Sequence, residues 1–88
     1  MNTIYKHAVE LTDRQEILVP GFVRCLKVEM QNGKPCIWTE VDLKRQDEFF
    51  ALWVYVVGTG HLIPESTEYL GTVFDGSFVW HIFVNQQT

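Results

Sequence analysis

Residues 49–57 read Phe-Phe-Ala-Leu-Trp-Val-Tyr-Val-Val, an unbroken apolar run in which only the phenol of Tyr55 is polar. Aromatic and β-branched residues of this kind favour a β-strand. A strand with one wet face would alternate apolar and polar residues, so this pattern predicts a strand buried on both faces. In so small a chain such a strand either crosses a closed barrel or packs against another subunit, and we expect a homo-oligomer.

Turn residues divide the rest of the chain into short segments of β-forming residues, which leaves no room for a long helix. We therefore predict an all-β fold, a small antiparallel β-barrel or sandwich of about six to seven short strands, in a single domain of residues 1–88. The expected strands cover residues 3–9, 15–19, 22–31, 35–42, 48–57, 68–74 and 77–84. One helical turn is expected, in residues 42–48 or in residues 12–15.

The Asn32-Gly33 pair predicts a two-residue type I′ turn between two antiparallel strands. The turn fixes the register, and the predicted pairs are Gln31 with Lys34, Glu29 with Cys36, Lys27 with Trp38, and Cys25 with Glu40. One face of this hairpin is then apolar and is expected to be core: Leu26, Val28, Met30, Ile37 and Val41. Trp38 is expected to project from the other, largely charged face.

The Asp75-Gly76 pair predicts a second hairpin by the same argument. Here the expected register places Gly71 opposite Trp80 and Leu70 opposite His81. An aromatic ring over a bare glycine backbone stabilises a sheet, so Gly71 and Trp80 are expected to have a structural role. The richer core face of this hairpin is expected to hold Tyr69, Val73, Phe78, Trp80 and Ile82, with His81 on the opposite face.

Length and charge exclude several classes of protein. Eighty-eight residues are too few for a two-domain enzyme. The formal net charge of -4 argues against a duplex-binding module, because such modules carry an excess of lysine and arginine. No apolar run approaches the roughly 20 residues that span a bilayer, and residues 1–10 contain no apolar signal core. We expect a cytoplasmic protein.

The two cysteines are expected to be free thiols. In the register above, Cys25 and Cys36 share a face but are offset by about 13 Å along the hairpin, which is too far for a disulfide. The spacing of the cysteines and of His7, His61 and His81 matches no common zinc motif, and we expect neither a metal nor a cofactor.

The segment that runs from Gly58 to His61 reads Gly-Thr-Gly-His and directly follows the apolar run. Its glycines can turn amide groups inward, and together with a hydroxyl and an imidazole they can cradle an anion. An ordinary glycine turn with an exposed histidine is the competing interpretation. The chain has no nucleophile elbow, P-loop or dinucleotide fingerprint, so we expect no enzymatic activity.

Several blocks of the sequence, in this order, resemble a family of short phage and bacterial proteins known only as a domain of unknown function. These blocks are residues 3–6, 12–15, 31–33 with 35–38, 58–61 with 63–64, 69–72 and 79–83. The resemblance covers nearly the whole chain. It implies a phage or prophage origin and a site in the host cytoplasm, and it brings no assigned activity or catalytic residue. Residues 49–57 are more apolar than the family pattern.

The matched blocks contain polar and aromatic residues that a core does not require, and these are the contents of a small-ligand pocket. The candidate ligand-binding residues are Tyr5, Arg14, Trp38, Thr59, His61 and His81. Tyr5 and Trp38 are expected to stack on the ligand, and the other four to hold its negative charge. The expected function is sequestration of a small anionic ligand, such as a nucleotide-derived host immune signal, which would make the protein an anti-defence factor.

Two other functions remain open from the sequence. In the first, the apolar run and Trp38 form an interface, and the protein is an inhibitor of a host protein or a phage assembly subunit. In the second, more remote, His61 and His81 act as base and acid in the hydrolysis of a nucleotide.

Overall fold

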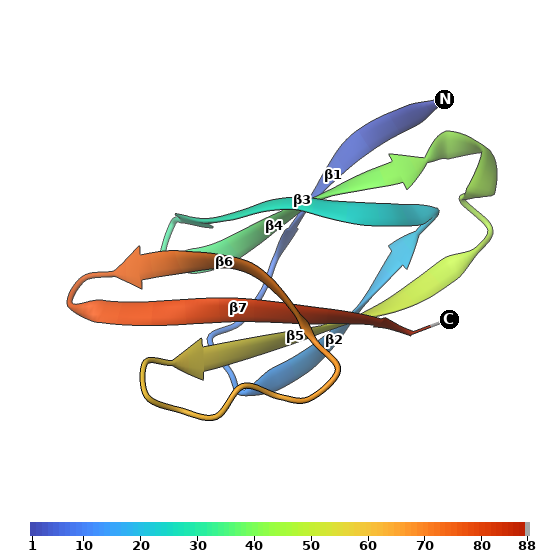
Figure 1. Ribbon diagram of the computed structural model, residues 1–88. Helices are drawn as coiled ribbons and strands as arrows, with labels where there is room; N and C mark the ends of the chain where they lie inside the picture. The colour runs from blue at the N-terminus through green and yellow to red at the C-terminus, as the bar shows by residue number, and fades with distance from the viewer. Residues whose placement is uncertain (88) are drawn as a thin grey trace.

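The computed structural model describes residues 1–87 and shows seven β-strands and one 3-10 turn (Figure 1). The strands are β1 (Asn2–Ala8), β2 (Arg14–Pro20), β3 (Phe22–Gln31), β4 (Lys34–Asp42), β5 (Phe49–Gly58), β6 (Glu68–Asp75) and β7 (Phe78–Gln87). The 3-10 turn is η1 (Leu43–Arg45), and its Lys44 N–H donates to the Asp42 carboxylate at 2.9 Å. The expected all-β class is confirmed. The helical turn lies in residues 42–48, and residues 12–15 enter a strand instead.

The strands form two antiparallel sheets that pack face to face as a sandwich (Figure 1). One sheet has the order β1-β4-β3 and the other the order β2-β5-β7-β6. The sheets do not close on one another, so the barrel alternative is wrong and the sandwich is correct. The core between them is formed by Val9, Val19, Phe22, Val28, Ile37, Val41, Leu52, Val54, Val73, Ile82 and Val84.

The apolar run forms β5, which lies in the interior of the four-stranded sheet between β2 and β7. Leu52 and Val54 point into the core and are almost fully buried. Trp53 and Tyr55 point to the opposite, outer side of the sheet and are half-buried. The two-sided apolar pattern therefore arises from one core face and one outer face that is also largely apolar.

The β3–β4 hairpin has the expected register near its turn. Gln31 pairs with Lys34, Glu29 with Cys36 and Lys27 with Trp38. Beyond that point, irregularities between Cys25 and Lys27 and between Phe22 and Arg24 shift the pairing, so Cys25 pairs with Thr39 and Arg24 with Glu40. The predicted Cys25–Glu40 pair is wrong for this reason. The bulge also turns Cys25 toward the core and leaves Leu26 exposed, which removes Leu26 from the predicted core.

The β6–β7 hairpin turns at Gly76-Ser77 rather than at Asp75-Gly76, because Asp75 already pairs with Phe78. Gly76 has a φ of 60°, and glycine at the first turn position is the preference of a type II′ turn. The turn therefore lies one residue later than predicted, and the pairings next to it shift by two residues along β7. Val73 faces Trp80 and Thr72 faces His81, while Tyr69 and Phe78 are exposed instead of forming core.

Trp80 does lie opposite a glycine, but that glycine is Gly58 of β5 rather than Gly71. Gly71 has a different role, since a Cβ placed on it would stand only 2.8 Å from Cγ1 of Val28 in the other sheet. The missing side chain of Gly71 thus permits the close approach of β6 to β3.

The connection from β5 to β6, residues 59–67, crosses the outer side of β7, because β7 lies between these two strands in the sheet (Figure 1). The Asn85 side chain on β7 donates to the Ser66 carbonyl at 2.8 Å and fixes the connection there. Phe83, which points to the outer side of β7, is only 9% exposed. Within the described part of the chain, no helix is long and apolar enough to span a bilayer.

Candidate functional site

The candidate site begins where β5 ends. Gly58 is the last residue of the strand, and the His61 N–H donates back to the Gly58 carbonyl at 3.1 Å, which closes a tight turn. Gly60 has a φ of 90°, a conformation that favours glycine. The turn lays the His61 ring against Gly58, with Nδ1 only 3.2 Å from the position of a Cβ on that residue. The Gly-Thr-Gly-His sequence therefore sets the position of His61 through its glycines.

His81 lies beside this turn on β7 and holds two strands and the connection together. Its Nε2 is 2.8 Å from the Thr59 hydroxyl, and its Nδ1 is 2.9 Å from the Thr72 hydroxyl on β6. The Thr72 hydroxyl is in turn 2.6 Å from the phenol oxygen of Tyr69. These four residues form one continuous hydrogen-bonded chain.

These hydrogen-bonded side chains border a small pocket of about 260 Å³. Its apolar wall includes Val57, Ile63 and Phe83, and Tyr69 meets Phe83 edge to face at a centroid distance of 5.5 Å. Thr59, His61 and His81 supply its hydroxyl and imidazole groups. An apolar wall with a few polar groups at one side suits a small ligand that has a ring and one polar or anionic group.

The two threonine partners allow His81 to be neutral or charged. A hydroxyl can donate or accept, so each ring nitrogen keeps a partner in either protonation state. When both nitrogens are protonated, Nε2–H donates to Thr59, and the Thr59 hydroxyl is then free to donate to a ligand. The arrangement can therefore present positive charge and a hydroxyl donor to an anion without losing an internal hydrogen bond.

The structure brings together three of the six predicted binding residues, Thr59, His61 and His81. Arg14 lies on the same side of the four-stranded sheet, but it pairs with Tyr55 two strands from His81, about 10 Å or more away. Its guanidinium stacks on Trp53 at 4.9 Å from the ring centroid.

Tyr5 and Trp38 lie in the other sheet and do not join the site. The Tyr5 side chain packs against the core, and its hydroxyl donates to Gln46 at 2.9 Å. Trp38 lies on the outer side of β4, with Lys6 and Lys27 paired on either side of it. The expected stacking of both rings on one ligand is therefore not compatible with the fold, since they lie on opposite faces of their sheet.

Sequence reasoning missed Tyr69 and Thr72, which complete the hydrogen-bonded chain. The register error placed Leu70, rather than Thr72, opposite His81, and the irregularity between Tyr69 and Gly71, which moves Tyr69 to the outer face, was not predicted. The Gly76-Ser77 turn was the signal that could have corrected it, because glycine followed by serine also forms two-residue hairpin turns.

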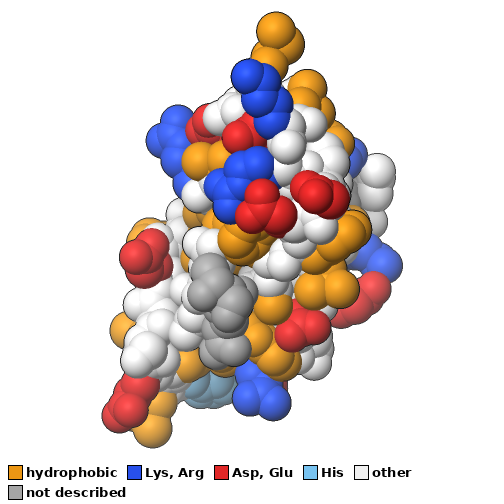
Figure 2. Space-filling model, turned by 90° about the vertical axis from the view of Figure 1, so that its right-hand side faces the viewer, with side chains coloured by type: hydrophobic (Ala, Val, Ile, Leu, Met, Phe, Trp, Pro, Cys, Tyr) orange, Lys and Arg blue, Asp and Glu red, His pale blue; other side chains and the backbone are white. Residues whose placement is uncertain are grey.

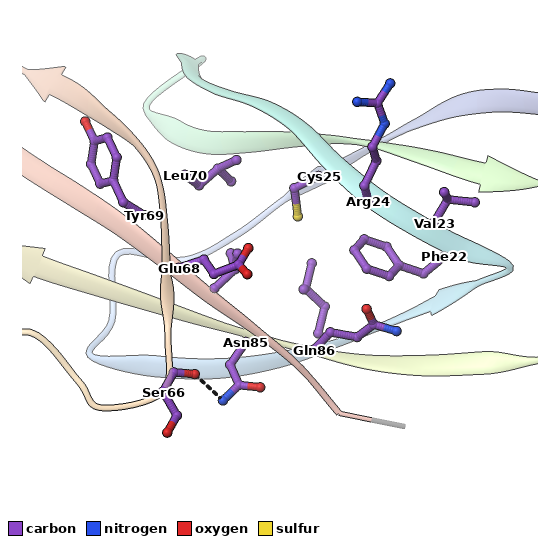
Figure 3. Close-up of a pocket in the computed structure, with 12 residues that line it drawn as sticks. Phe22, Val23, Arg24, Cys25, Ser66, Glu68, Tyr69, Leu70, Asn85 and Gln86 are labelled. Atoms are coloured by element: carbon purple, nitrogen blue, oxygen red, sulfur yellow. Dashed lines mark hydrogen bonds between the residues drawn. The ribbon is translucent and has the colours of Figure 1, made fainter.

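A larger cavity of about 480 Å³ opens between β3 and the β6–β7 side of the other sheet (Figure 3). None of the six predicted residues lines it. The Cys25 thiol points into this cavity, whereas the Arg24 side chain points away from it (Figure 3). Burial, aided by the charge of Glu68, raises the pKa of Cys25 to about 11, so this thiol is protonated near neutral pH. Both cysteines are free, and no three His, Cys, Asp or Glu side chains among the described residues gather as a metal site.

Comparisons with known proteins give a family but no characterised relative. Neither the curated proteins nor the solved structures contain a match to the chain. The model of one family, described as a domain of unknown function (DUF7352), matches residues 1–88. The chain therefore belongs to the DUF7352 family.

Proposed function

We propose that this protein binds a small anionic ligand in the pocket beside His81 and holds it without chemical change. The observation that carries the proposal is the hydrogen-bonded chain from Thr59 through His81 and Thr72 to Tyr69, at the edge of an apolar pocket that His61 also lines. The imidazoles and the Thr59 hydroxyl receive the anionic group. The wall formed by Val57, Ile63 and Phe83 receives the ring.

A mononucleotide-type signal is the ligand class that we propose. It combines one flat ring system with phosphate charge, and the pocket of about 260 Å³ is too small for a large ligand. Sequestration of such a signal in a host cell would make the protein an anti-defence factor of a phage.

The fold limits which surfaces could form the protein-binding interface of the competing hypothesis. Trp38 belongs to the three-stranded sheet, and the outer side of β5 belongs to the four-stranded sheet on the other side of the sandwich. Trp38 and the outer side of β5 therefore cannot form one continuous interface with a single partner.

Thermal unfolding in the presence of nucleotides and cyclic nucleotides tests the ligand proposal. A ligand at 100 times its Kd adds about 2.7 kcal/mol, which raises the Tm of a domain of this size by roughly 10 °C. Native mass spectrometry of the same samples identifies the retained compound. If no compound raises the Tm or stays bound, the proposal is wrong.

Variants then locate the site. His61→Ala and Thr59→Val should each weaken binding at least about tenfold, because each removes a polar group from the pocket. His7→Gln is the matched control, since it removes a histidine from the other sheet and should leave the Kd unchanged. Binding that survives the His61→Ala/Thr59→Val double variant would place the ligand elsewhere.

A further inference from the structure

The two outer faces of the sandwich differ sharply in charge. The outer face of the three-stranded sheet carries Lys6, Arg24, Lys27, Glu29 and Glu40, with ion pairs between Arg24 and Glu40 at 2.7 Å and between Lys27 and Glu29 at 3.1 Å. Basic and acidic side chains also lie side by side on the end of the molecule near the N-terminus, at the top of Figure 2. This is an ordinary solvated surface.

The outer face of the four-stranded sheet is largely apolar. We call it the β5 face and define it by Arg14, Glu16, Leu18, Phe49, Ala51, Trp53, Tyr55, Thr72 and Phe74, which the strand pairing places on the outer side together with the residues under the β5–β6 connection. Leu18 is 59% exposed and Phe49 is 64% exposed. Arg14 and Glu16 are its only charged residues among those named.

We propose that a second copy of this chain packs on the β5 face to form a symmetric dimer. The size of the face fits this occupant. Strands of seven to ten residues, spaced about 4.8 Å apart with a rise of about 3.3 Å per residue, give this side of the sandwich an area of roughly 500 Å², which includes the β5–β6 connection that lies over β7. Two such faces, each treated as flat, bury a total of roughly 1,000 Å² when they pack together. This area reaches the lower limit for a specific interface.

The charges of the β5 face also fit a second copy. Arg14 and Glu16 lie two residues apart on β2 and point to the same side of the sheet. In a two-fold dimer each copy presents the same surface, so Arg14 of one copy can meet Glu16 of the other, and the pair occurs twice. The charges of Arg14 and Glu16 cancel, so the β5 face does not attract a strongly acidic or strongly basic partner.

The dimer does not depend on the proposed ligand site. Thr72 belongs to both surfaces, but the residues whose substitution tests the dimer, Leu18, Arg14 and Glu16, lie on β2, whereas His81 and its hydrogen-bond partners lie on β7, β6 and the turn after β5. Loss of ligand binding therefore leaves the dimer proposal intact, and a monomeric protein leaves the ligand proposal intact.

Sedimentation analysis from low to high micromolar concentration tests the dimer. The unmodified protein should show a reversible monomer–dimer equilibrium, and Leu18→Glu should weaken it at least about tenfold. Ile4→Glu is the matched control, because Ile4 is also 59% exposed on an outer strand face but belongs to the three-stranded sheet. A monomer at all concentrations, or equal weakening by both variants, would overturn the proposal.

A charge exchange tests the two-fold arrangement and remains informative if Leu18→Glu fails to fold. Arg14→Glu places acidic side chains against each other and should weaken the dimer. Adding Glu16→Arg restores opposite charges across the axis and should recover most of the lost affinity. If Arg14→Glu has no effect, or the double variant stays as weak as the single one, the β5 face is not the interface of a two-fold dimer.

Discussion

The indole of Trp80 on β7 lies directly opposite Gly58 on β5, and its ring is 3.7 Å from the position of a Cβ on that glycine. The His61 ring approaches the same position even more closely, at 3.2 Å. Gly58 thus joins two features of the molecule. Because Gly58 has no side chain, the Trp80 ring can pack over the end of the sheet, and the His61 ring can pack against Gly58 at the edge of the candidate pocket.

Gly58→Ala should disturb His61 more than it disturbs the fold. Gly58 has no positive φ, so alanine fits its backbone, and we expect the free energy of unfolding to change by less than about 1 kcal/mol. The new methyl group must displace the exposed His61 ring. NMR should show shifted His61 ring resonances, with weaker ligand binding. In a His61→Ala background the same substitution has no ring to displace, so any loss of affinity that persists there would contradict this explanation.

Gly71→Ala should destabilise the sandwich itself. Its Cβ would stand 2.8 Å from Cγ1 of Val28, a core residue of the opposite sheet, so the sheets would have to move apart. Forcing a methyl group into a packed core costs about 1 to 3 kcal/mol. Urea unfolding of Gly71→Ala, Val28→Ala and the double variant should show favourable coupling of at least about 0.5 kcal/mol. Strictly additive costs would mean that Gly71 and Val28 do not limit the approach of the sheets.

The sequence predicted the strands well because turn residues and apolar runs are local signals. All seven expected strands are present, and the register next to the Asn32-Gly33 turn is correct. The bulge between Cys25 and Lys27 was not predictable, because it depends on how β3 packs over the other sheet. That bulge exchanges the environments of Cys25 and Leu26.

The candidate site was only partly predictable for a related reason. Thr59 and His61 are neighbours in sequence, and the glycines around them mark a turn. The contact of Thr59 with His81 spans 22 residues and depends on β7 lying beside β5, which no local pattern specifies. The choice between two adjacent turn pairs, Asp75-Gly76 and Gly76-Ser77, then decided whether Leu70 or Thr72 lay opposite His81.

His7 should make the stability of the protein depend on pH. It lies in β1, with Nε2 3.1 Å from the hydroxyl of the fully buried Thr39, and burial lowers the pKa of His7 below 6.5. The unfolded chain therefore binds a proton more readily than the folded protein as the pH falls below 6.5, and the free energy of unfolding decreases.

Urea unfolding between pH 8 and pH 5 should show this decrease, and His7→Gln should reduce it. This range stays above pH 4.5. Below that value, protonation of Glu40 would also decrease the free energy of unfolding, because the hydrogen bond from Arg24 lowers the pKa of that carboxyl. An unchanged slope in His7→Gln would assign the pH dependence to other groups.

The Cys25 thiol should be nearly inert in the folded protein. With a folded-state pKa of about 11 against an ordinary value of 9.0, about one thiol in a thousand is ionised at pH 8, compared with about one in ten in the unfolded chain. Cys36→Ala isolates Cys25, and iodoacetamide should label this variant about 100-fold more slowly under native conditions than in urea. Mass spectrometry measures both rates. Because the opening of the cavity between the sheets governs access to Cys25, rapid labelling of the native protein would show that the β3 side of the sandwich opens readily.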